Sequence, residues 1–358
     1  MRAAIFLALA TGAALAQAPS PEQLFHDAVA AQQRGDDATA IRKYQELLKL
    51  RPDVVEVRAN LGAALAKQGR FDEAIEQYRA ALAKNQSSVP LRLNLALAYY
   101  KKGAFQGAIQ ELAPLHKADS SNERVAMLLA DSYAHLGKDD QVIAILQPLD
   151  LAHRDDLALQ WLLGSALIRT GDRRQGLERV ETVAKAGNNA EAYLLAARTA
   201  LELTYFERAR DDADAAARLN PQLPGLLSVR GMALYYLGET ETAKGLLEKA
   251  LAADPNDFDA HLALGAGLRV DRDLPAARRH LARALELRPD STVARYEMAR
   301  LERAEGNLEA AVHDLEKVVH DDPKWPQPHI ELSALYFQVN RPEDGERERA
   351  TFDRLKEK

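Results

Sequence analysis

Residues 60–74 read NLGAALAKQGRFDEA, and this stretch carries the signals that decide the fold. Gly62 and Ala74 are small residues, and each is surrounded by larger apolar residues at helical spacing, such as Leu65. Gly69 stands between them, where a turn separates two helical patterns. The stretch therefore predicts an antiparallel pair of helices whose backbones approach closely at Gly62 and Ala74.

The pattern recurs with a period of 34 residues, marked by Gly35, Gly69, Gly103, Gly137 and Gly171. A period of this length is typical of stacked helix pairs. The eighth residue of each unit is glycine, alanine or serine in all ten units, and the twentieth is alanine, glycine or valine. After a one-residue deletion near residues 187–189, the units continue to the end of the chain. They begin at Pro21, Val55, Val89, Glu123, Leu157, Ala190, Pro224, Phe258, Thr292 and Pro326.

These residues resemble the tetratricopeptide repeat, which has small residues at positions 8 and 20, glycine near 15 and proline at 32. Proline stands at position 32 in five units, as Pro52, Pro221, Pro255, Pro289 and Pro323. The resemblance implies an all-α fold, a right-handed superhelical solenoid of antiparallel helix pairs. We expect residues 21–358 to form one such solenoid, with a charged last helix over 342–357 that caps it.

Two features modify the regular pattern. Pro114 and Pro148 fall inside the expected second helices of units three and four, so both helices should kink or stop early. At the other end of the array, Ser20 precedes Pro21 and Gln23 in an arrangement that predicts a capping box at the first helix.

The N-terminus has the features of a secretory signal peptide. Arg2 precedes an apolar run over residues 3–15, and small residues allow cleavage after Ala16 or Ala18. The alternative is an uncleaved N-terminal helix. The run is too short to span a bilayer, and the absence of cysteine excludes a lipoprotein anchor and disulfides. We therefore expect a signal peptide over residues 1–18 and a soluble exported protein, periplasmic or secreted, with no membrane span after its removal.

Composition and motifs argue against several classes of function. A net charge of −6 provides no strong basic field, so we expect no nucleic-acid partner. The chain has no phosphate-binding glycine loop and no hydrolase or zinc-protease motif, so we expect no catalytic residue and no cofactor. His313, Glu316 and His320 have a spacing that suits a metal, but they lie on the second helix of unit nine, which the resemblance implies faces outward, so we interpret them as a solvated polar face.

The resemblance also implies a concave surface, lined by positions 2, 5, 6, 9, 12 and 13 of the first helices, that holds an extended peptide. Asparagine at position 6 can bond a ligand backbone in this family, although asparagine is also simply common at this position. The arginines on the same face suit carboxylates. Apolar residues are in excess on this surface, which is typical of a binding site. Burial by superhelical winding or by dimerisation is an alternative reason for this excess. For the arginines, the alternative is that Glu297 balances their charge. The predicted peptide-binding groove comprises Asn60, Asn94, Leu97, Tyr100, Met127, Trp161, Ile168, Leu195, Met232, Tyr235, Tyr236, Arg269, Arg300 and Arg303.

The sequence thus favours an extracytoplasmic adaptor or scaffold that binds another polypeptide, apolar with an acidic part, for example in a cell-envelope assembly or secretion complex. A holdase-type chaperone for apolar segments is the alternative, and a metal-binding protein or enzyme is a weaker third candidate. The partner, the pathway and the oligomeric state are not encoded in any recognisable pattern.

Overall fold

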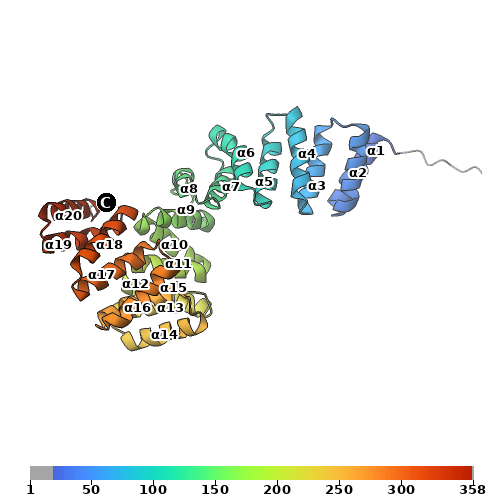
Figure 1. Ribbon diagram of the computed structural model, residues 1–358. Coiled ribbons are helices and arrows are strands. Elements are labelled where there is room, and N and C mark those ends of the chain that lie inside the picture. The colour runs from blue at the N-terminus through green and yellow to red at the C-terminus, as the bar shows by residue number, and fades with distance from the viewer. Residues whose placement is uncertain (1–18, 357–358) are drawn as a thin grey trace, which may run out of the picture. The chain divides into compact units, whose positions relative to one another are not determined.

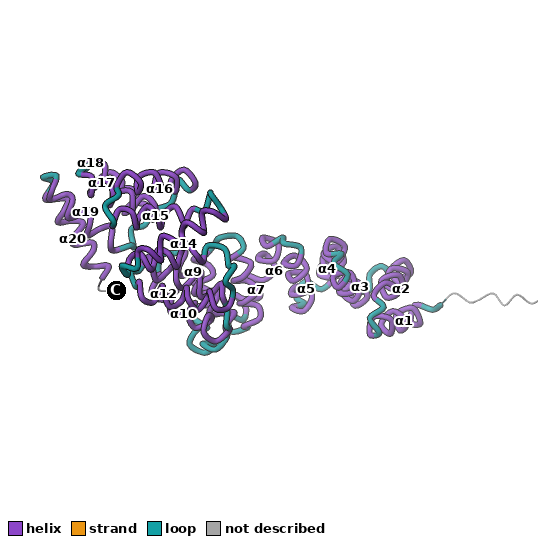
Figure 2. The backbone as a smooth tube through the Cα atoms, turned by 90° about the horizontal axis from the view of Figure 1, so that it is seen from below, coloured by secondary structure: helices purple, strands orange, loops and turns teal. Residues whose placement is uncertain are grey.

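The computed structural model describes residues 19–356, and every regular element among them is an α-helix (Figures 1 and 2). The signal peptide expected over residues 1–18 lies outside this range. No helix within it is both long and apolar enough to cross a bilayer. The chain divides into two compact units between Leu136 and Gly137. A single solenoid over residues 21–358 stays a prediction.

Unit one consists, in its described part, of seven helices: α1 (Pro21–Gln33), α2 (Asp37–Leu50), α3 (Val55–Lys67), α4 (Phe71–Lys84), α5 (Val89–Lys101), α6 (Phe105–Ala118) and α7 (Glu123–Ala134). Unit two contains thirteen up to residue 356: α8 (Asp139–Leu146), α9 (Leu157–Arg169), α10 (Arg173–Gly187), α11 (Ala190–Glu202), α12 (Phe206–Leu219), α13 (Leu226–Tyr236), α14 (Thr240–Ala253), α15 (Phe258–Val270), α16 (Leu274–Leu287), α17 (Thr292–Glu305), α18 (Leu308–Asp321), α19 (Pro326–Gln338) and α20 (Pro342–Lys356).

Small residues set the close approach within the helix pairs. A Cβ atom on Gly62 of α3 would lie 2.8 Å from the Tyr78 ring of α4, and one on Gly265 of α15 would lie 2.5 Å from Leu281 of α16. Real Cβ atoms do not tolerate such distances, so neither position admits alanine without a shift of its neighbour. The eighth residue of these units is small because the partner helix occupies the space beside it.

The recurring glycines lie in the turns within the pairs, where the backbone is left-handed. Gly69 has a φ of 75°, and the equivalent residues of later units include Thr204 at 61°, Arg272 at 67° and Asn340 at 61°. Side chains disfavour this conformation, and glycine adopts it freely. The turn geometry is therefore kept in units that have lost the glycine, at a cost in backbone strain.

The first helix begins with half of the predicted capping box. The Ser20 hydroxyl accepts a hydrogen bond from the Gln23 backbone N–H at 3.2 Å. The Gln23 side chain instead donates to Asp27, one turn further along α1, at 2.9 Å. The serine cap thus forms, while the reciprocal bond from the glutamine side chain does not.

The two interior prolines have different outcomes. Helix α6 continues past Pro114 to Ala118, whereas α8 ends at Leu146, two residues before Pro148. The segment after α8 is held by Asp150, which accepts hydrogen bonds from Gln160 at 2.8 Å and from Arg179 at 2.7 Å. An early stop is therefore found only at the second proline.

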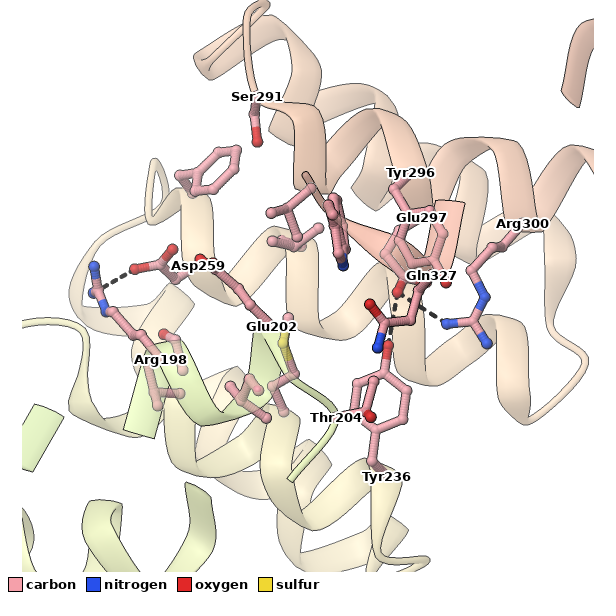
Figure 3. Close-up of a pocket in the computed structure, with 18 of the residues that line it drawn as sticks. Arg198, Glu202, Thr204, Tyr236, Asp259, Ser291, Tyr296, Glu297, Arg300 and Gln327 are labelled. Carbon is pink, nitrogen blue, oxygen red and sulfur yellow. Dashed lines mark hydrogen bonds and ion pairs between the residues drawn. The ribbon is translucent and has the colours of Figure 1, made fainter. Parts of the chain in front are cut away.

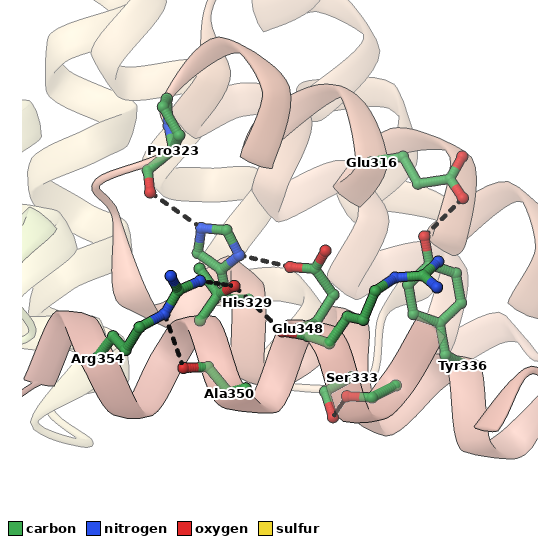
Figure 4. Close-up of polar contacts among 11 residues, drawn as sticks. Glu316, Pro323, His329, Ser333, Tyr336, Glu348, Ala350 and Arg354 are labelled. Carbon is green, nitrogen blue, oxygen red and sulfur yellow. Dashed lines mark hydrogen bonds and ion pairs between the residues drawn. The ribbon is translucent and has the colours of Figure 1, made fainter. Parts of the chain in front are cut away.

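Polar contacts join the last helix of unit two to the rest of the stack (Figure 4). The buried His329 ring on α19 places Nδ1 2.5 Å from a Glu348 oxygen on α20, and Ser333 donates to the Gly345 carbonyl at 2.8 Å. Gly345 is the one residue classed as buried among the described residues of α20. This mostly polar helix is thus attached by hydrogen bonds and ion pairs more than by apolar burial.

Unit two also closes on itself. Arg173, at the start of α10, bonds Glu202 at the end of α11 and reaches Asp322 beyond α18 at 2.6 Å. In the same region the Lys324 amine lies 3.5 Å from the Thr170 carbonyl oxygen. These contacts join the α9–α10 turn to the α18–α19 turn, which are about 150 residues apart in sequence.

Candidate binding pocket

A pocket of about 550 Å³ lies on the inner side of unit two, between the odd-numbered helices α11, α13, α15, α17 and the start of α19 (Figure 3). Its volume is in the range of ordinary ligand sites. The apolar part of its wall is formed by Leu201, Phe206, Val229, Met232, Phe258, Leu262, Val293 and Trp325.

The centre of the polar wall is Glu297 on α17, whose side chain is nearly inaccessible to solvent. It accepts hydrogen bonds from the Tyr236 hydroxyl at 2.7 Å, from Arg300 at 3.1 Å and from Arg269 at 3.2 Å. Burial disfavours the carboxylate, but Arg300 and Arg269 outweigh it, so the pKa of Glu297 lies below its usual range. Glu297 is therefore a charged, fully bonded anchor and is not free to bind a ligand.

A second polar group adjoins the first. The Tyr296 hydroxyl donates to Glu331 at 2.7 Å, and Arg300 lies 3.5 Å from the same carboxylate. The Tyr296 ring packs against Trp325, with ring centroids 4.7 Å apart. Burial and the charge of Glu331 raise the pKa of Tyr296, so its hydroxyl remains a donor. The aromatic wall is thus fixed in orientation by these hydrogen bonds.

At the other side of the pocket, Arg198 pairs with Asp259 across 61 residues of sequence, at 2.5 Å. Burial raises the pKa of Asp259 even though Arg198 opposes this. Arg198 lies against Gly225, where a Cβ atom would be 2.3 Å from the guanidinium. A side chain at this position would displace the end of the Arg198 side chain, and the positive φ of 78° also favours glycine there.

Arg288 at the pocket is the exception among these charges. Its guanidinium carbon lies 4.1 Å from the centroid of the Phe258 ring, and its side chain is exposed. No carboxylate within residues 19–356 lies at ion-pair distance from it. Arg288 is thus a cation stacked on an aromatic surface and available to an anion.

Three polar atoms of the wall have no hydrogen-bond partner within the described part of the chain. They are Nε of Arg198 and Nε1 of Trp325, both donors, and Oε1 of Gln327, an acceptor. All three atoms are shielded from solvent. A ligand that offers both an acceptor and a donor, as a peptide group does, would satisfy the Trp325 and Gln327 atoms once a shift of the wall exposes them.

Family models described as tetratricopeptide repeat match residues 27–90, 65–131, 101–167, 162–224, 229–292 and 268–329. These ranges cover most of the chain. The chain belongs to the tetratricopeptide repeat family. No curated protein matches it in sequence.

Solved structures with similar architecture include tetratricopeptide repeat arrays from different sources. Yeast Tom70 is 16% identical, with a TM-score of 0.42, over 94% of this chain and 92% of that one. Cut9, in the APC/C hetero-tetramer Cut9–Hcn1, is 14% identical, with a TM-score of 0.45, over 94% and 87%. Human IFIT1, in a dimer with PPP-AAAA, is 18% identical, with a TM-score of 0.48, over 74% and 67%.

Three residues of the predicted groove line the pocket: Met232, Tyr236 and Arg300. Trp161, Ile168 and Leu195 are half-buried and pack against the apolar core of α10 and α11. Arg303 is exposed on α17. Arg269 and Arg300 pair with Glu297, so neither has its charge free for a ligand.

Tyr235 has a different surrounding from its neighbour Tyr236. It is 3% exposed, and its ring fills the space beside Gly267, where a Cβ atom would lie 2.5 Å from the ring. Tyr235 therefore packs between α13 and α15 and does not line the pocket.

The predicted groove residues of unit one are on its odd-numbered helices. Asn94 is exposed, and Asn60, Leu97, Tyr100 and Met127 are half-buried. The Tyr100 hydroxyl bonds Asp131, and its ring packs on Phe105 and His135. Peptide binding at these residues stays a prediction.

Several residues of the pocket were missing from the prediction. Arg198, Asp259, Tyr296 and Glu331 occupy positions 9, 2, 5 and 6 of their repeats, so the register of the concave face already pointed to them. Trp325 and Arg288 lie between repeats, where no helical period applies. Sequence alone gave no signal for these two.

No group of three or more histidine, aspartate or glutamate residues is arranged to hold a metal between residues 19 and 356. The Glu316 carboxylate accepts a hydrogen bond from Tyr336 at 2.7 Å and from Arg341 at 3.1 Å. The spacing of His313, Glu316 and His320 therefore does not correspond to a preformed site.

Proposed function

We propose that this tetratricopeptide repeat protein is an exported adaptor that binds a segment of another polypeptide in the pocket of unit two. The N-terminal sequence, with Arg2 before an apolar run and small residues at 16 and 18, supports export. The observation that carries the proposal is the pocket itself, which combines an apolar wall with an unpartnered donor and acceptor.

The chemistry of the wall defines the partner. An apolar side chain enters between Met232, Phe258 and Leu262, and its peptide group meets Trp325 and Gln327. An acidic residue next to it pairs with Arg288, which has no carboxylate at ion-pair distance in residues 19–356. Arg269 and Arg300 are excluded from this role because the carboxylates of Glu297 and Glu331 together balance their charges.

The fixed wall favours an adaptor over a holdase. A chaperone that binds many segments needs a surface that can repack, whereas Tyr236, Tyr296 and both arginines are held by hydrogen bonds to Glu297 and Glu331. A pre-organised site of this kind discriminates between ligands.

Site-specific crosslinking tests the proposal. A photoreactive amino acid at Met232 should capture one partner in the native compartment, and the same group at Glu248, exposed on α14, should not. For reversible binding of the partner identified by capture, Arg288→Glu should weaken the affinity at least tenfold, which is about 1.4 kcal/mol. Arg279→Glu, at an exposed position of α16, should leave the affinity unchanged. Equal capture at 232 and 248, or equal binding by both arginine variants, contradicts the assignment.

A further inference from the structure

The contact that closes unit two has a direct connection to the pocket. Arg173 joins Glu202 to Asp322, and we call these three residues the latch. Glu202 is also part of the pocket wall. The latch therefore connects a residue of the pocket to the opposite end of the superhelical turn.

Trp325 provides a second connection. It lines the pocket, and the Arg173 guanidinium carbon lies 5.9 Å from the centroid of its ring. A single arginine thus holds one wall residue by an ion pair and another by a cation–π contact. Movement of Arg173 would change both parts of the wall together.

The latch is made of side chains that project from turns and helix ends. Arg173 is mostly buried and is held by its ion pairs with Glu202 and Asp322 and by its contact with the Trp325 ring. Burial disfavours its charge, but Glu202 and Asp322 outweigh this effect and raise its pKa. Salt screens partly buried ion pairs only weakly, so the closure is opened by replacing one of these charged groups.

A closed turn also restricts what can reach its inner side. A bound segment that continues as chain on both sides can enter a closed turn only if one end of the polypeptide first passes through the turn. A small molecule or a free chain end has no such restriction.

We propose that the latch is a gate: an internal segment of the partner enters the pocket only while Arg173 is released, and closure then retains it. The gate rests on the proposed function, since it regulates the same pocket. It makes binding of an internal segment dependent on latch opening.

The first test observes the latch without any ligand. The chain has two tryptophans, so Trp161→Phe leaves Trp325 as the sole fluorescent indole. Arg173→Ala and Asp322→Asn should both raise the quenching of Trp325 by acrylamide at least twofold over the parent protein, and the second variant leaves the arginine beside the ring.

Arg169→Ala is the matched control, because Arg169 pairs with Asp139 at 2.7 Å and not with the latch. Its quenching should follow that of the parent protein. If Trp325 is quenched equally in the parent and in both latch variants, the gate is wrong.

The second test locks the latch. A Cβ atom at Gly171 would lie 3.7 Å from Cβ of Lys324, within the range of disulfides, and the chain has no other cysteine. The variant Gly171→Cys with Lys324→Cys is compared oxidised and reduced. Gly171→Cys alone controls for its φ of 91°, which favours glycine.

Two probes separate the gate from the pocket. An unfolded synthetic polypeptide with an apolar residue next to an acidic one at its centre, the chemistry proposed for the partner, should bind the oxidised protein at least tenfold more slowly than the reduced one. Anilinonaphthalene sulfonate, a small apolar anion, should bind both equally. If the unfolded chain binds both forms at one rate, the gate fails and the pocket stands. If neither probe binds the reduced protein, the proposed function fails. The quenching of Trp325 then remains as the test of whether the latch opens and closes.

Discussion

The Tyr236 hydroxyl donates a hydrogen bond to the Glu297 carboxylate at 2.7 Å, although 61 residues separate the two in sequence. The bond joins α13 to α17 and passes across α15. Tyr236→Phe should lower the free energy of unfolding by about 1–2 kcal/mol, because a buried carboxylate loses one donor. Urea unfolding measures this change. Tyr205→Phe, at an exposed tyrosine, should stay within about 0.5 kcal/mol, and equal losses would contradict a structural role for the bond.

Asp212 on α12 makes stability depend on pH. Burial, together with the nearby charge of Glu181, raises its pKa to about 7 from a model-compound value of 3.8. The folded state therefore keeps a proton that the unfolded chain has lost. Stability should fall as the pH rises from about 4 to about 7 and level off above that.

Asp212→Asn should remove this decline and raise stability at pH 8 by about 1–3 kcal/mol. Denaturant unfolding at several pH values, taken as the difference between variant and parent, measures it. Asp211→Asn is the control, since its side chain is 68% exposed. The assignment is wrong if both variants have the pH profile of the parent.

Gly267 and Gly245 should respond to alanine in opposite directions. A Cβ atom at Gly267 would meet the Tyr235 ring at 2.5 Å, whereas one at Gly245 on α14 meets nothing within 4 Å. Gly267→Ala should therefore cost about 1–3 kcal/mol through overpacking. Gly245→Ala should gain about 0.5–1 kcal/mol through helix propensity. Thermal unfolding compares the two, and changes of the same sign would argue against the packing described between α13 and α15.

Arg272 occupies a turn that favours glycine, with a φ of 67°. Arg272→Gly should raise the free energy of unfolding by about 0.5–1 kcal/mol, because the left-handed conformation no longer strains a side chain. Arg279→Gly, within α16, should lower it by about 1 kcal/mol. If both variants lower the free energy of unfolding, the Arg272 side chain makes stabilising contacts that outweigh the backbone strain.

The repeat register predicted three residues of the pocket wall, Met232, Tyr236 and Arg300, because a fixed period assigns faces. Tyr296, at position 5 of its repeat, lies on the same inner side for this reason but was not among the predicted residues. Tyr235, at position 12, packs into the gap left by Gly267 on the next odd-numbered helix. Whether a large residue at this position is buried depends on the size of its neighbour in the following repeat, which the period does not express.

Other parts of the site depend on features outside the period. Trp325 and Arg288 lie in connections between repeats, and the contact of Arg173 with Asp322 depends on how far small rotations accumulate over five repeats. The pairing of Arg269 and Arg300 with Glu297 was one of two open alternatives at the level of sequence. These contacts cannot be predicted from the repeat pattern, because they depend on the three-dimensional arrangement that many local geometries produce together.

A solenoid is ordinarily a row of nearest-neighbour interfaces, so its terminal repeats fray without affecting distant ones. The bond between Arg173 and Asp322 adds an interaction between repeats five and nine that such a one-dimensional description lacks. Fraying from α20 towards α18 must then also release α10. Over the described residues of unit two, unfolding should approach a single cooperative transition and not proceed repeat by repeat from the C-terminal end.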